Sequence, residues 1–266
     1  MVSQVSAILY FALSLFYLAN GSPIVKTNNG HLFGSSENEA NVFYSVPYAQ
    51  PPVGNMRFQD PVAIGYHGDI HVTNDTGVSC ISMSFTCTDE KQCPKFESED
   101  CLYLNVYVPK KVDLSDPTNP PKADLPVLVW IHGGAFAFGS GLMPMYDGRF
   151  VSEKSGAIVV SINYRYMPFG FLAMSTGSSS APGNMGIHDQ QLALEWVQEN
   201  IAAFGGNKQQ VTIFGESAGA QSVALHLMST TSKPLFSNAI MQSNPSTFLF
   251  KTAAEAQELG TRLAKR

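Results

Sequence analysis

Residues 211–220 read Val-Thr-Ile-Phe-Gly-Glu-Ser-Ala-Gly-Ala, and they decide how the rest of the chain is interpreted. Strand-forming residues lead into a Gly-x-Ser-x-Gly motif, and a helix-compatible segment follows at residues 221–228. A nucleophile elbow requires this order, because its serine sits in a tight turn between a strand and a helix. The glycines on either side remove the Cβ atoms that would collide there. We therefore predict that Ser217 projects above a sheet, next to helix N–H groups that favour an oxyanion.

A second glycine motif, Trp-Ile-His-Gly-Gly-Ala-Phe at residues 130–136, follows an apolar run at residues 126–131. That run is typical of a strand buried on both faces of a parallel sheet, and ligands bind beyond the carboxyl ends of such strands. A Gly-Gly loop lets backbone N–H groups face a cavity, as a tetrahedral oxyanion requires. Either motif alone could be a chance turn in a chain with 22 glycines, but their occurrence together favours a hydrolase site.

The composition indicates a globular protein with a large core. Of the 266 residues, 44% are hydrophobic and 14% are charged, which suits one large domain or part of one. The formal net charge is −5 and there is no run of basic residues, so a nucleic acid is not expected as a partner. No motif calls for a cofactor, and the oligomeric state is left open.

The N-terminus has the pattern of a signal peptide. An apolar run at residues 7–19 is too short to span a bilayer, and its end, Ala19-Asn20-Gly21, has small residues where a signal peptidase requires them. We therefore expect residues 1–21 to be removed before Ser22, leaving residues 22–266 as the mature, secreted product. The first residues carry no Lys or Arg, so a membrane anchor is the alternative, although a stable anchor is not the expected outcome.

Secretion would place the four cysteines in an oxidising compartment, where disulfides are expected. Their even number fits two disulfides, and the absence of Cys-x-x-Cys spacing argues against zinc. The cysteines are Cys80, Cys87, Cys93 and Cys101. Asn74, in Asn-Asp-Thr, is a candidate glycosylation site, whereas the sequon at Asn20 would be lost with the signal peptide.

Apolar runs and helical periodicity alternate along the chain, which predicts an α/β sheet covered on both sides. A hairpin is expected at residues 23–33, around Asn-Asn-Gly. Irregular stretches at residues 60–94 and 113–124 are expected to be surface loops. The expected strands are residues 42–48, 102–108, 126–131, 158–162, 211–214 and 239–242, and the expected helices are residues 186–204, 221–228 and 253–266.

With these motifs in view, the chain closely resembles the type-B carboxylesterase/lipase family, the α/β-hydrolases that include cholinesterases. The resemblance covers residues 34–266 and rests on PPVGNMRF at 51–58, SEDCLYLN at 98–105, WIHGGAF at 130–136, NYR at 163–165, NMGIHDQ at 184–190, FGG at 204–206 and GESAG at 215–219. It implies an α/β-hydrolase fold with a mostly parallel central sheet flanked by helices, ending here soon after the nucleophile elbow. It also implies that Ser217 is the nucleophile and that the backbone N–H groups of Gly134, Ala135 and Ala218 bind the oxyanion. Alanine at position 135 is expected to cost nothing, because the donor is main chain.

The resemblance further implies structural pairs. In the family the Cys of the Glu-Asp-Cys-Leu motif pairs with an upstream Cys, which makes Cys80 the expected partner of Cys101 and leaves Cys87 with Cys93. The residues alone leave the other two pairings possible. Buried ion pairs of the family map to Arg57 with Glu99 and to Arg165 with Asp189.

The rest of the catalytic triad is not evident in this sequence. The only histidine after Ser217 is His226, which a helix would place roughly 13 Å further on, beyond hydrogen-bond reach. His132 is nearer, but it is not the base in the family. In α/β-hydrolases the acid and then the histidine follow the serine, so both are expected beyond Arg266. This chain alone is accordingly expected to be the N-terminal part of the domain and to be inactive.

The expected function is a secreted serine esterase that hydrolyses carboxylic esters with an apolar acyl or alcohol group. A choline ester is disfavoured, because cholinesterases hold the ammonium group with a Trp in the Cys-bounded loop, and the only tryptophans here are Trp130 and Trp196. The alternative is a catalytically inactive protein, either a truncated product or an adhesion-type relative that uses the fold to bind a partner.

Overall fold

The computed structural model describes residues 21–66, 70–71, 78–82, 96–176, 179–245 and 250–265. Residues 1–20 of the predicted signal peptide lie outside this part of the chain, as do Cys87, Cys93 and the sequon at Asn74. The predictions made for them therefore stay predictions.

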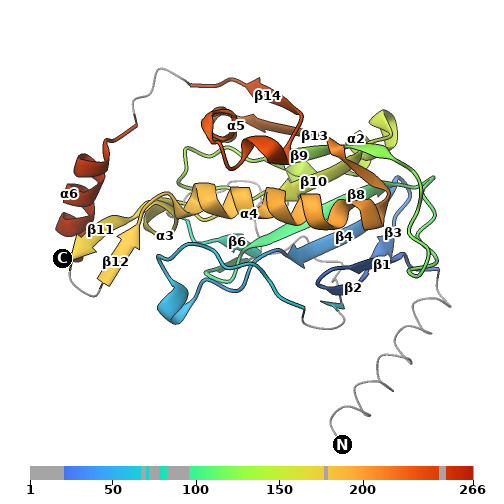
Figure 1. Cartoon of the computed structure of the whole chain (residues 1–266), viewed down its shortest axis with the longest axis horizontal. Coiled ribbons are helices and arrows are strands. Elements are labelled where there is room, and N and C mark those ends of the chain that lie inside the picture. The colour runs from blue at the N-terminus through green and yellow to red at the C-terminus, as the bar shows by residue number, and fades with distance from the viewer. Residues whose placement is uncertain are drawn as a thin grey trace, which may run out of the picture.

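A seven-stranded sheet forms the centre of the fold, in the order β14-β13-β9-β10-β8-β4-β3 (Figure 1). Its strands are β3 (Ser35–Ser36), β4 (Ala40–Pro47), β8 (Tyr103–Pro109), β9 (Leu125–Ile131), β10 (Ile158–Ile162), β13 (Gly206–Glu216) and β14 (Asn238–Gln242). β9 pairs in parallel with β10 and β13, and β13 pairs in parallel with β14. The other three pairings, β10 with β8, β8 with β4 and β4 with β3, are antiparallel.

The α/β class is confirmed, but the sheet is mixed and not mostly parallel. The N-terminal strands account for the difference. β3 and β4 are joined by residues 37–39, a connection too short for anything but antiparallel neighbours. In contrast, every residue of β10 is buried, which matches its largely apolar sequence between two covered faces.

The predicted helices are present, with shifted ends. The helix expected at residues 186–204 is α4 (Met185–Asn200) followed by a 3₁₀ turn, η3 (Ile201–Phe204), and it stops at Gly205, whose φ is +86°. The helix that leaves the Ser217 turn is α5 (Ala218–Met228), and the last is α6 (Ala253–Ala264). Two short helices, α2 (Arg149–Ser155) and α3 (Met167–Phe171), were not foreseen.

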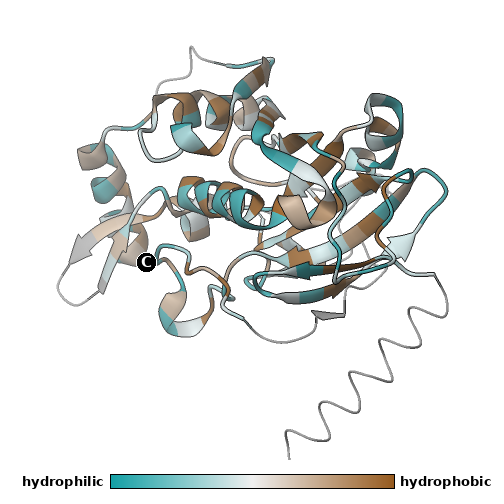
Figure 2. Cartoon of the chain, turned by 45° about the vertical axis from the view of Figure 1, so that its right-hand side comes forward, coloured by the Kyte–Doolittle hydropathy of each residue, from teal (hydrophilic) through white to brown (hydrophobic). Residues whose placement is uncertain are grey.

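Neighbouring residues of β4 show that helical segments cover both faces of the sheet. Phe43 packs edge-to-face on Phe204 of η3, with ring centroids 5.0 Å apart. The next residue, Tyr44, packs on Tyr107, whose carbonyl accepts a hydrogen bond from Ser152 of α2. Successive side chains of a strand point to opposite faces, so η3 and α2 lie on opposite sides. Figure 2 shows hydrophilic residues on the outward side of α4 and hydrophobic ones along the central strands.

Smaller sheets surround this core. The predicted hairpin is confirmed as β1 (Ile24–Thr27) and β2 (Gly30–Phe33), and β2 also pairs with β5 (Ile70–His71). β6 (Val78–Cys80) pairs with β7 (Phe96–Ser98), and β11 (Ala173–Thr176) with β12 (Ser179–Pro182). Within the described part of the chain, no helix combines the length and apolar character needed to cross a membrane.

Candidate active site

Ser217 occupies the turn between β13 and α5, in a backbone conformation that a serine rarely adopts. Its φ is +54° and its ψ is −119°. Such a conformation costs free energy of the order of 1–3 kcal/mol and persists only where the surroundings impose it. Part of that constraint comes from β14, because the Ser217 N–H donates to the carbonyl of Gln242 at 3.0 Å. The side chain of Ser217 is partly exposed.

The glycines of the motif are required by the end of the neighbouring strand β9. A Cβ on Gly219 would lie 2.0 Å from the carbonyl oxygen of Ile131, the last residue of β9. A Cβ on Gly215 would lie 2.7 Å from the same oxygen and 2.6 Å from Gly219. The turn therefore fits directly against β9, which brings Ser217 beside the loop that follows that strand.

That loop, residues 132–138 and called the glycine loop below, touches the serine. A Cβ built on Gly133 would be 3.2 Å from Cβ of Ser217. Gly134, Ala135 and Phe136 all have positive φ, at +112°, +55° and +56°. Alanine at position 135 therefore carries strain of about 1 kcal/mol, which corrects the expectation that it costs nothing.

Three N–H groups of the glycine loop and of the first turn of α5 are available to an acceptor. The glycine loop closes on the carbonyl of Gly134, which accepts from Ala137 and Phe138, while the N–H groups of Gly134 and Ala135 have no acceptor among the described residues. Ala218 is the first residue of α5, where N–H groups lack partners within a helix. The loop that contains Gly134 and Ala135 thus meets the turn that contains Ser217 and Ala218, and the roles predicted for these four residues stay predictions.

His132 is buried beneath the glycine loop and holds one of its peptide groups. Its Nδ1 lies 2.7 Å from the carbonyl oxygen of Gly133, so Nδ1 carries the proton and donates it. In a trans peptide group the N–H points away from the carbonyl. By holding the Gly133 carbonyl, the hydrogen bond from His132 therefore sets the direction of the Gly134 N–H. The ring stacks on Tyr164 with centroids 4.4 Å apart, and the Tyr164 hydroxyl donates to the His132 carbonyl at 2.8 Å. Burial lowers the pKa of His132 to about 4, so the ring is neutral near pH 7.

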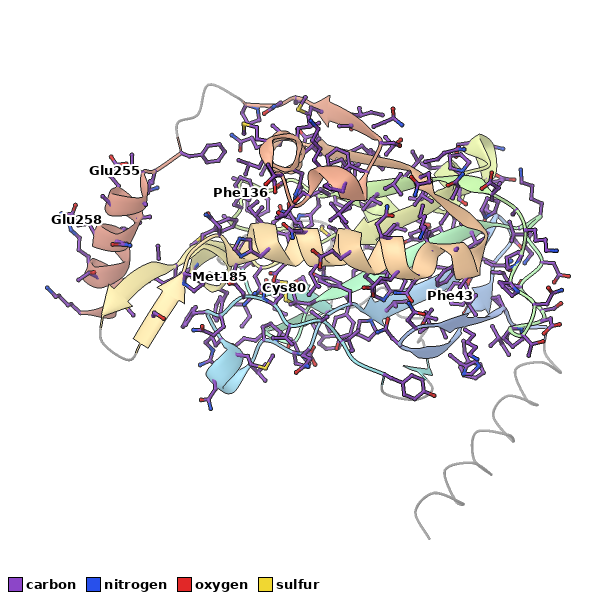
Figure 3. The ribbon with its side chains drawn as sticks, in the orientation of Figure 1. Phe43, Cys80, Phe136, Met185, Glu255 and Glu258 are labelled. Carbon is purple, nitrogen blue, oxygen red and sulfur yellow. A yellow bond between two sulfur atoms is a disulfide. The ribbon has the colours of Figure 1, made fainter. Side chains whose placement is uncertain are left out.

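Two residues of the Asn-Tyr-Arg-Tyr segment, Asn163 and Tyr166, hydrogen-bond the backbone of two cysteines that form a disulfide. The predicted Cys80–Cys101 disulfide is confirmed, and Figure 3 labels Cys80. The Asn163 amide donates to the carbonyl of Cys101 at 3.1 Å and accepts from the N–H of Gly141 at 2.9 Å. The Tyr166 hydroxyl lies 2.6 Å from the carbonyl of Cys80. No role was predicted for these residues, although an asparagine directly after an apolar strand is a usable signal.

The predicted ion pairs are present, but only one is buried. Arg165 donates to both carboxylate oxygens of Asp189, at 2.7 and 2.8 Å, and the two side chains are 3% and 0% exposed. Arg57 pairs with Glu99, yet its side chain is 42% exposed, because it lies on a loop outside the sheet. The expectation of burial was wrong for this pair.

The rings of His132, His188 and His226 do not contact the hydroxyl of Ser217. His226 lies in α5 and hydrogen-bonds Gln190 and Ser232, and His188 pairs with Asp60. His132 uses Nδ1 for the glycine loop, and its Nε2 has no partner among the described residues. The geometry around Ser217 therefore offers a nucleophile and oxyanion donors without placing one of these rings as the general base.

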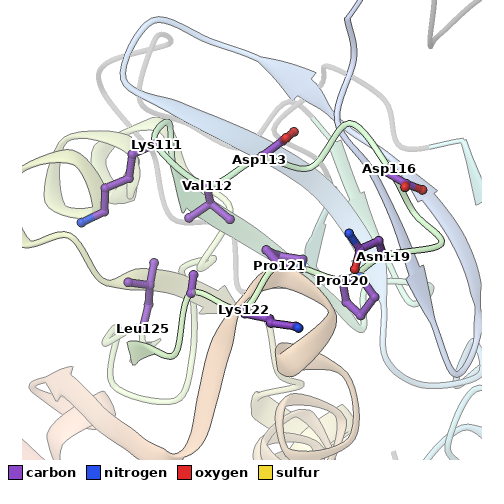
Figure 4. A pocket seen from close by; sticks show the side chains of 10 residues that line it. Lys111, Val112, Asp113, Asp116, Asn119, Pro120, Pro121, Lys122 and Leu125 are labelled. Carbon is purple, nitrogen blue, oxygen red and sulfur yellow. The ribbon is translucent and has the colours of Figure 1, made fainter.

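A cavity of about 650 Å³ opens elsewhere, between Lys111 and Leu125 (Figure 4). Leu125 is the first residue of β9, whereas the glycine loop follows the last. The lining mixes Lys111 and Lys122 with Asp113 and Asp116. This cavity lies at the opposite end of the strand from Ser217 and contributes nothing to that site.

Comparison with known proteins agrees with the geometry. A model of the carboxylesterase family matches residues 21–266. The chain is 44% identical to a cholinesterase of Mus musculus and 42% identical to a para-nitrobenzyl esterase of Bacillus subtilis (strain 168), over 91% and 87% of this chain and 40% and 45% of those relatives. The solved structure of a thermophilic PNB esterase superposes with a TM-score of 0.82 at 40% identity, covering 91% of this chain and 48% of that one. The chain thus spans less than half the length of these relatives.

Proposed function

The chain belongs to the carboxylesterase family, and on this premise we propose that its protein hydrolyses carboxylic esters with Ser217 as the nucleophile. The observation that carries the proposal is the meeting of the strained Ser217 turn with the glycine loop. The turn presents the serine, and the adjoining glycine loop and first turn of α5 carry the N–H groups of Gly134, Ala135 and Ala218, which have no acceptor among the described residues. This is the arrangement that acyl transfer to a serine requires.

In the proposed reaction the Ser217 oxygen attacks the ester carbonyl and its proton passes to a histidine. The negative charge on the former carbonyl oxygen is held by the three N–H groups. The carbon–oxygen bond to the alcohol then breaks, and the histidine returns the proton to the departing alcohol. Water, deprotonated by the same histidine, attacks the acyl-enzyme in the second half, releasing the acid and regenerating Ser217.

We propose that the histidine and its acidic partner come from sequence beyond Arg266. His132, His188 and His226 are engaged with other groups, as described above. The curated relatives are also more than twice as long as their matched portions. The chain order of α/β-hydrolases, with the serine first, agrees with this placement.

An apolar cavity supports the proposal that the ester carries an apolar group. It has a volume of about 590 Å³ and lies between the end of the glycine loop and α6. Its lining includes Phe136, Met167, Phe171, Leu225, Leu259 and Leu263. A choline ester is disfavoured, because both tryptophans are packed against other rings. Trp196 is 4% exposed and packs on Phe204, and Trp130 packs on Tyr146 and Phe214.

Secretion is part of the proposal. The Cys80–Cys101 disulfide supports it, because structural disulfides are typical of oxidising compartments. The apolar run at residues 7–19 supports it as well, as the hydrophobic part of a signal peptide.

The test is covalent labelling of the full-length gene product with a fluorophosphonate, alongside hydrolysis of p-nitrophenyl acetate. Wild-type protein and a Ser155→Ala control, altered at an exposed serine of α2, should be labelled and turn over the ester. Ser217→Ala should do neither. A folded wild-type protein that resists the probe would instead support the inactive, partner-binding alternative.

A further inference from the structure

A chain of buried polar side chains runs from α4 through α5 to the residues that follow it. Its members are Gln190 on α4, Ser222 and His226 on α5, and Ser232. All four side chains belong to residues that are at most 1% exposed. Buried polar groups of this kind are costly unless each donor and acceptor is matched.

The direction of every hydrogen bond in the chain follows from its inner end. The Ser222 hydroxyl donates its single proton to the carbonyl of Ala218, at 2.9 Å. Its oxygen must therefore accept from Gln190, whose Nε2 lies 3.1 Å away. This turns the Gln190 carbonyl oxygen toward Nε2 of His226, at 3.0 Å, so that Nε2 has to carry the ring proton.

The outer end completes the pattern. With the proton on Nε2, Nδ1 of His226 accepts from the Ser232 hydroxyl, 2.9 Å away. That hydroxyl also lies 3.2 Å from Oε1 of Gln191, which keeps the Thr231 hydroxyl as a donor when the Ser232 proton points to His226. Burial lowers the pKa of His226 to about 4, so the neutral ring is the form present near pH 7. The neutral ring with its proton on Nε2 thus matches the donors and acceptors from Ala218 to Ser232.

The inner end of the chain lies at the site. Ala218, whose carbonyl receives Ser222, is the residue that follows Ser217 and supplies one of the N–H groups around it. Gln190 adjoins Asp189, which is fixed by its ion pair with Arg165. This row of hydrogen bonds therefore connects the first turn of α5 to a rigid part of α4.

We propose that Gln190, Ser222 and His226 act as positioning residues that hold the first turn of α5, and with it the Ala218 N–H, in the orientation needed for the reaction of Ser217. This inference rests on the proposed function. His226 does not exchange protons with Ser217 here; it fixes the amide of Gln190, which fixes Ser222.

Two substitutions of one residue separate this role from simple core packing. The terminal nitrogen of a glutamine is as many bonds from Cβ as Nε2 of histidine, so His226→Gln can still donate to Gln190. An asparagine reaches only as far as Nδ1, so His226→Asn keeps the Ser232 contact and loses Gln190. Both variants replace a buried ring by an amide and lose some of its packing contacts, so both should lower the melting temperature by similar amounts.

The measurement is kcat and KM for p-nitrophenyl acetate in the full-length protein, with the rate constant for fluorophosphonate labelling. His226→Asn should lower kcat and the labelling rate about tenfold with KM within twofold of wild type, whereas His226→Gln should stay within threefold of wild type. Ser222→Ala should match His226→Asn, and the double variant should be no slower than either single one, because all three break the same chain.

Equal losses in the Asn and Gln variants, or no loss in either, would overturn the positioning role. Additive losses in the double variant would do the same. A wild-type protein that is folded but is neither labelled nor active would be a failure of the proposed function, which is a different result from any of these.

Discussion

The glycine loop and the first turn of α5 both adjoin Ser217, and each is supported by a fully buried histidine. The two rings differ in their bonding. His132 makes one hydrogen bond, to Gly133, and its Nε2 has no partner among the described residues, while its faces pack on aromatic rings. His226 has a partner at both nitrogens, 2.9 and 3.0 Å away. The loop side is thus shaped by backbone geometry and ring packing, and the helix side by matched polar side chains.

The difference teaches where each side can tolerate change. A polar chain can be partly rebuilt by another amide or hydroxyl that reaches the same atom. A backbone with three successive positive φ angles has no such substitute, because at Gly134 its shape depends on the absence of a Cβ. The following predictions test this contrast, from the largest expected effect to the smallest.

Gly134→Ala should be the most damaging change. The new Cβ would lie 2.1 Å from the carbonyl oxygen of Phe138, at a φ of +112° that alanine does not readily adopt. We expect the loop to shift and the labelling rate of Ser217 to fall by about 10²–10³, the range for losing an oxyanion donor. Gly65→Ala, where nothing lies within 4 Å, is the matched control and should behave as wild type. A labelled, fully active Gly134→Ala protein would contradict the assigned role of this loop.

Acidification should destabilise the protein through both histidines. Each folded-state pKa is about 4, below the ordinary value of 6.5, so between these values the unfolded chain binds protons that the folded chain does not. The stability is fully present above about pH 6.5 and is lost as the pH falls toward 4. From pH 7 to pH 5 the loss should be about 2 kcal/mol for each histidine. Urea unfolding at the two pH values should show a loss smaller by about that amount in His226→Gln, and an unchanged loss would exclude this histidine as a source.

Tyr164→Phe should have the smallest effect. It removes the hydroxyl that donates to the His132 carbonyl but leaves the ring that stacks on His132. We expect a loss of about 1 kcal/mol in the free energy of unfolding, the usual size for one buried hydrogen bond, with little change in labelling. Tyr66→Phe, at a side chain that is largely exposed, is the control. A tenfold fall in labelling would mean that the hydroxyl, and not ring packing, orients the loop.

Much of this architecture was predictable from the sequence, because it depends on local patterns. The apolar run of β10, the Gly-x-Ser-x-Gly turn and Gly205 at the end of η3 each reflect a requirement that nearby residues reveal. The direction of strands was not predictable in the same way, since alternation does not distinguish parallel from antiparallel neighbours. This is why the mixed sheet was missed.

The supporting residues of the site were the harder part. Gln190 and Ser222 occupy ordinary inward positions on their helices, and nothing in helical periodicity indicates that they bond each other. His226 was recognised only as too distant from Ser217 to be the base. Contacts between residues far apart in the sequence require the packed structure, because helix length and periodicity do not determine how α4 and α5 are set against each other.

The close fit of Gly219 against Ile131 has a consequence for how the molecule reaches its final state. These positions are widely separated in the chain, and the entropy of closing the intervening segment must be overcome before they can meet. Contacts of such long range are characteristic of slow folding steps. The strain at Ser217 can therefore be imposed only after β9 and β13 have paired. During refolding, the reactivity of Ser217 toward a fluorophosphonate should therefore appear after the circular dichroism signal of the helices has recovered. Labelling of this serine would then report on the last stage of folding.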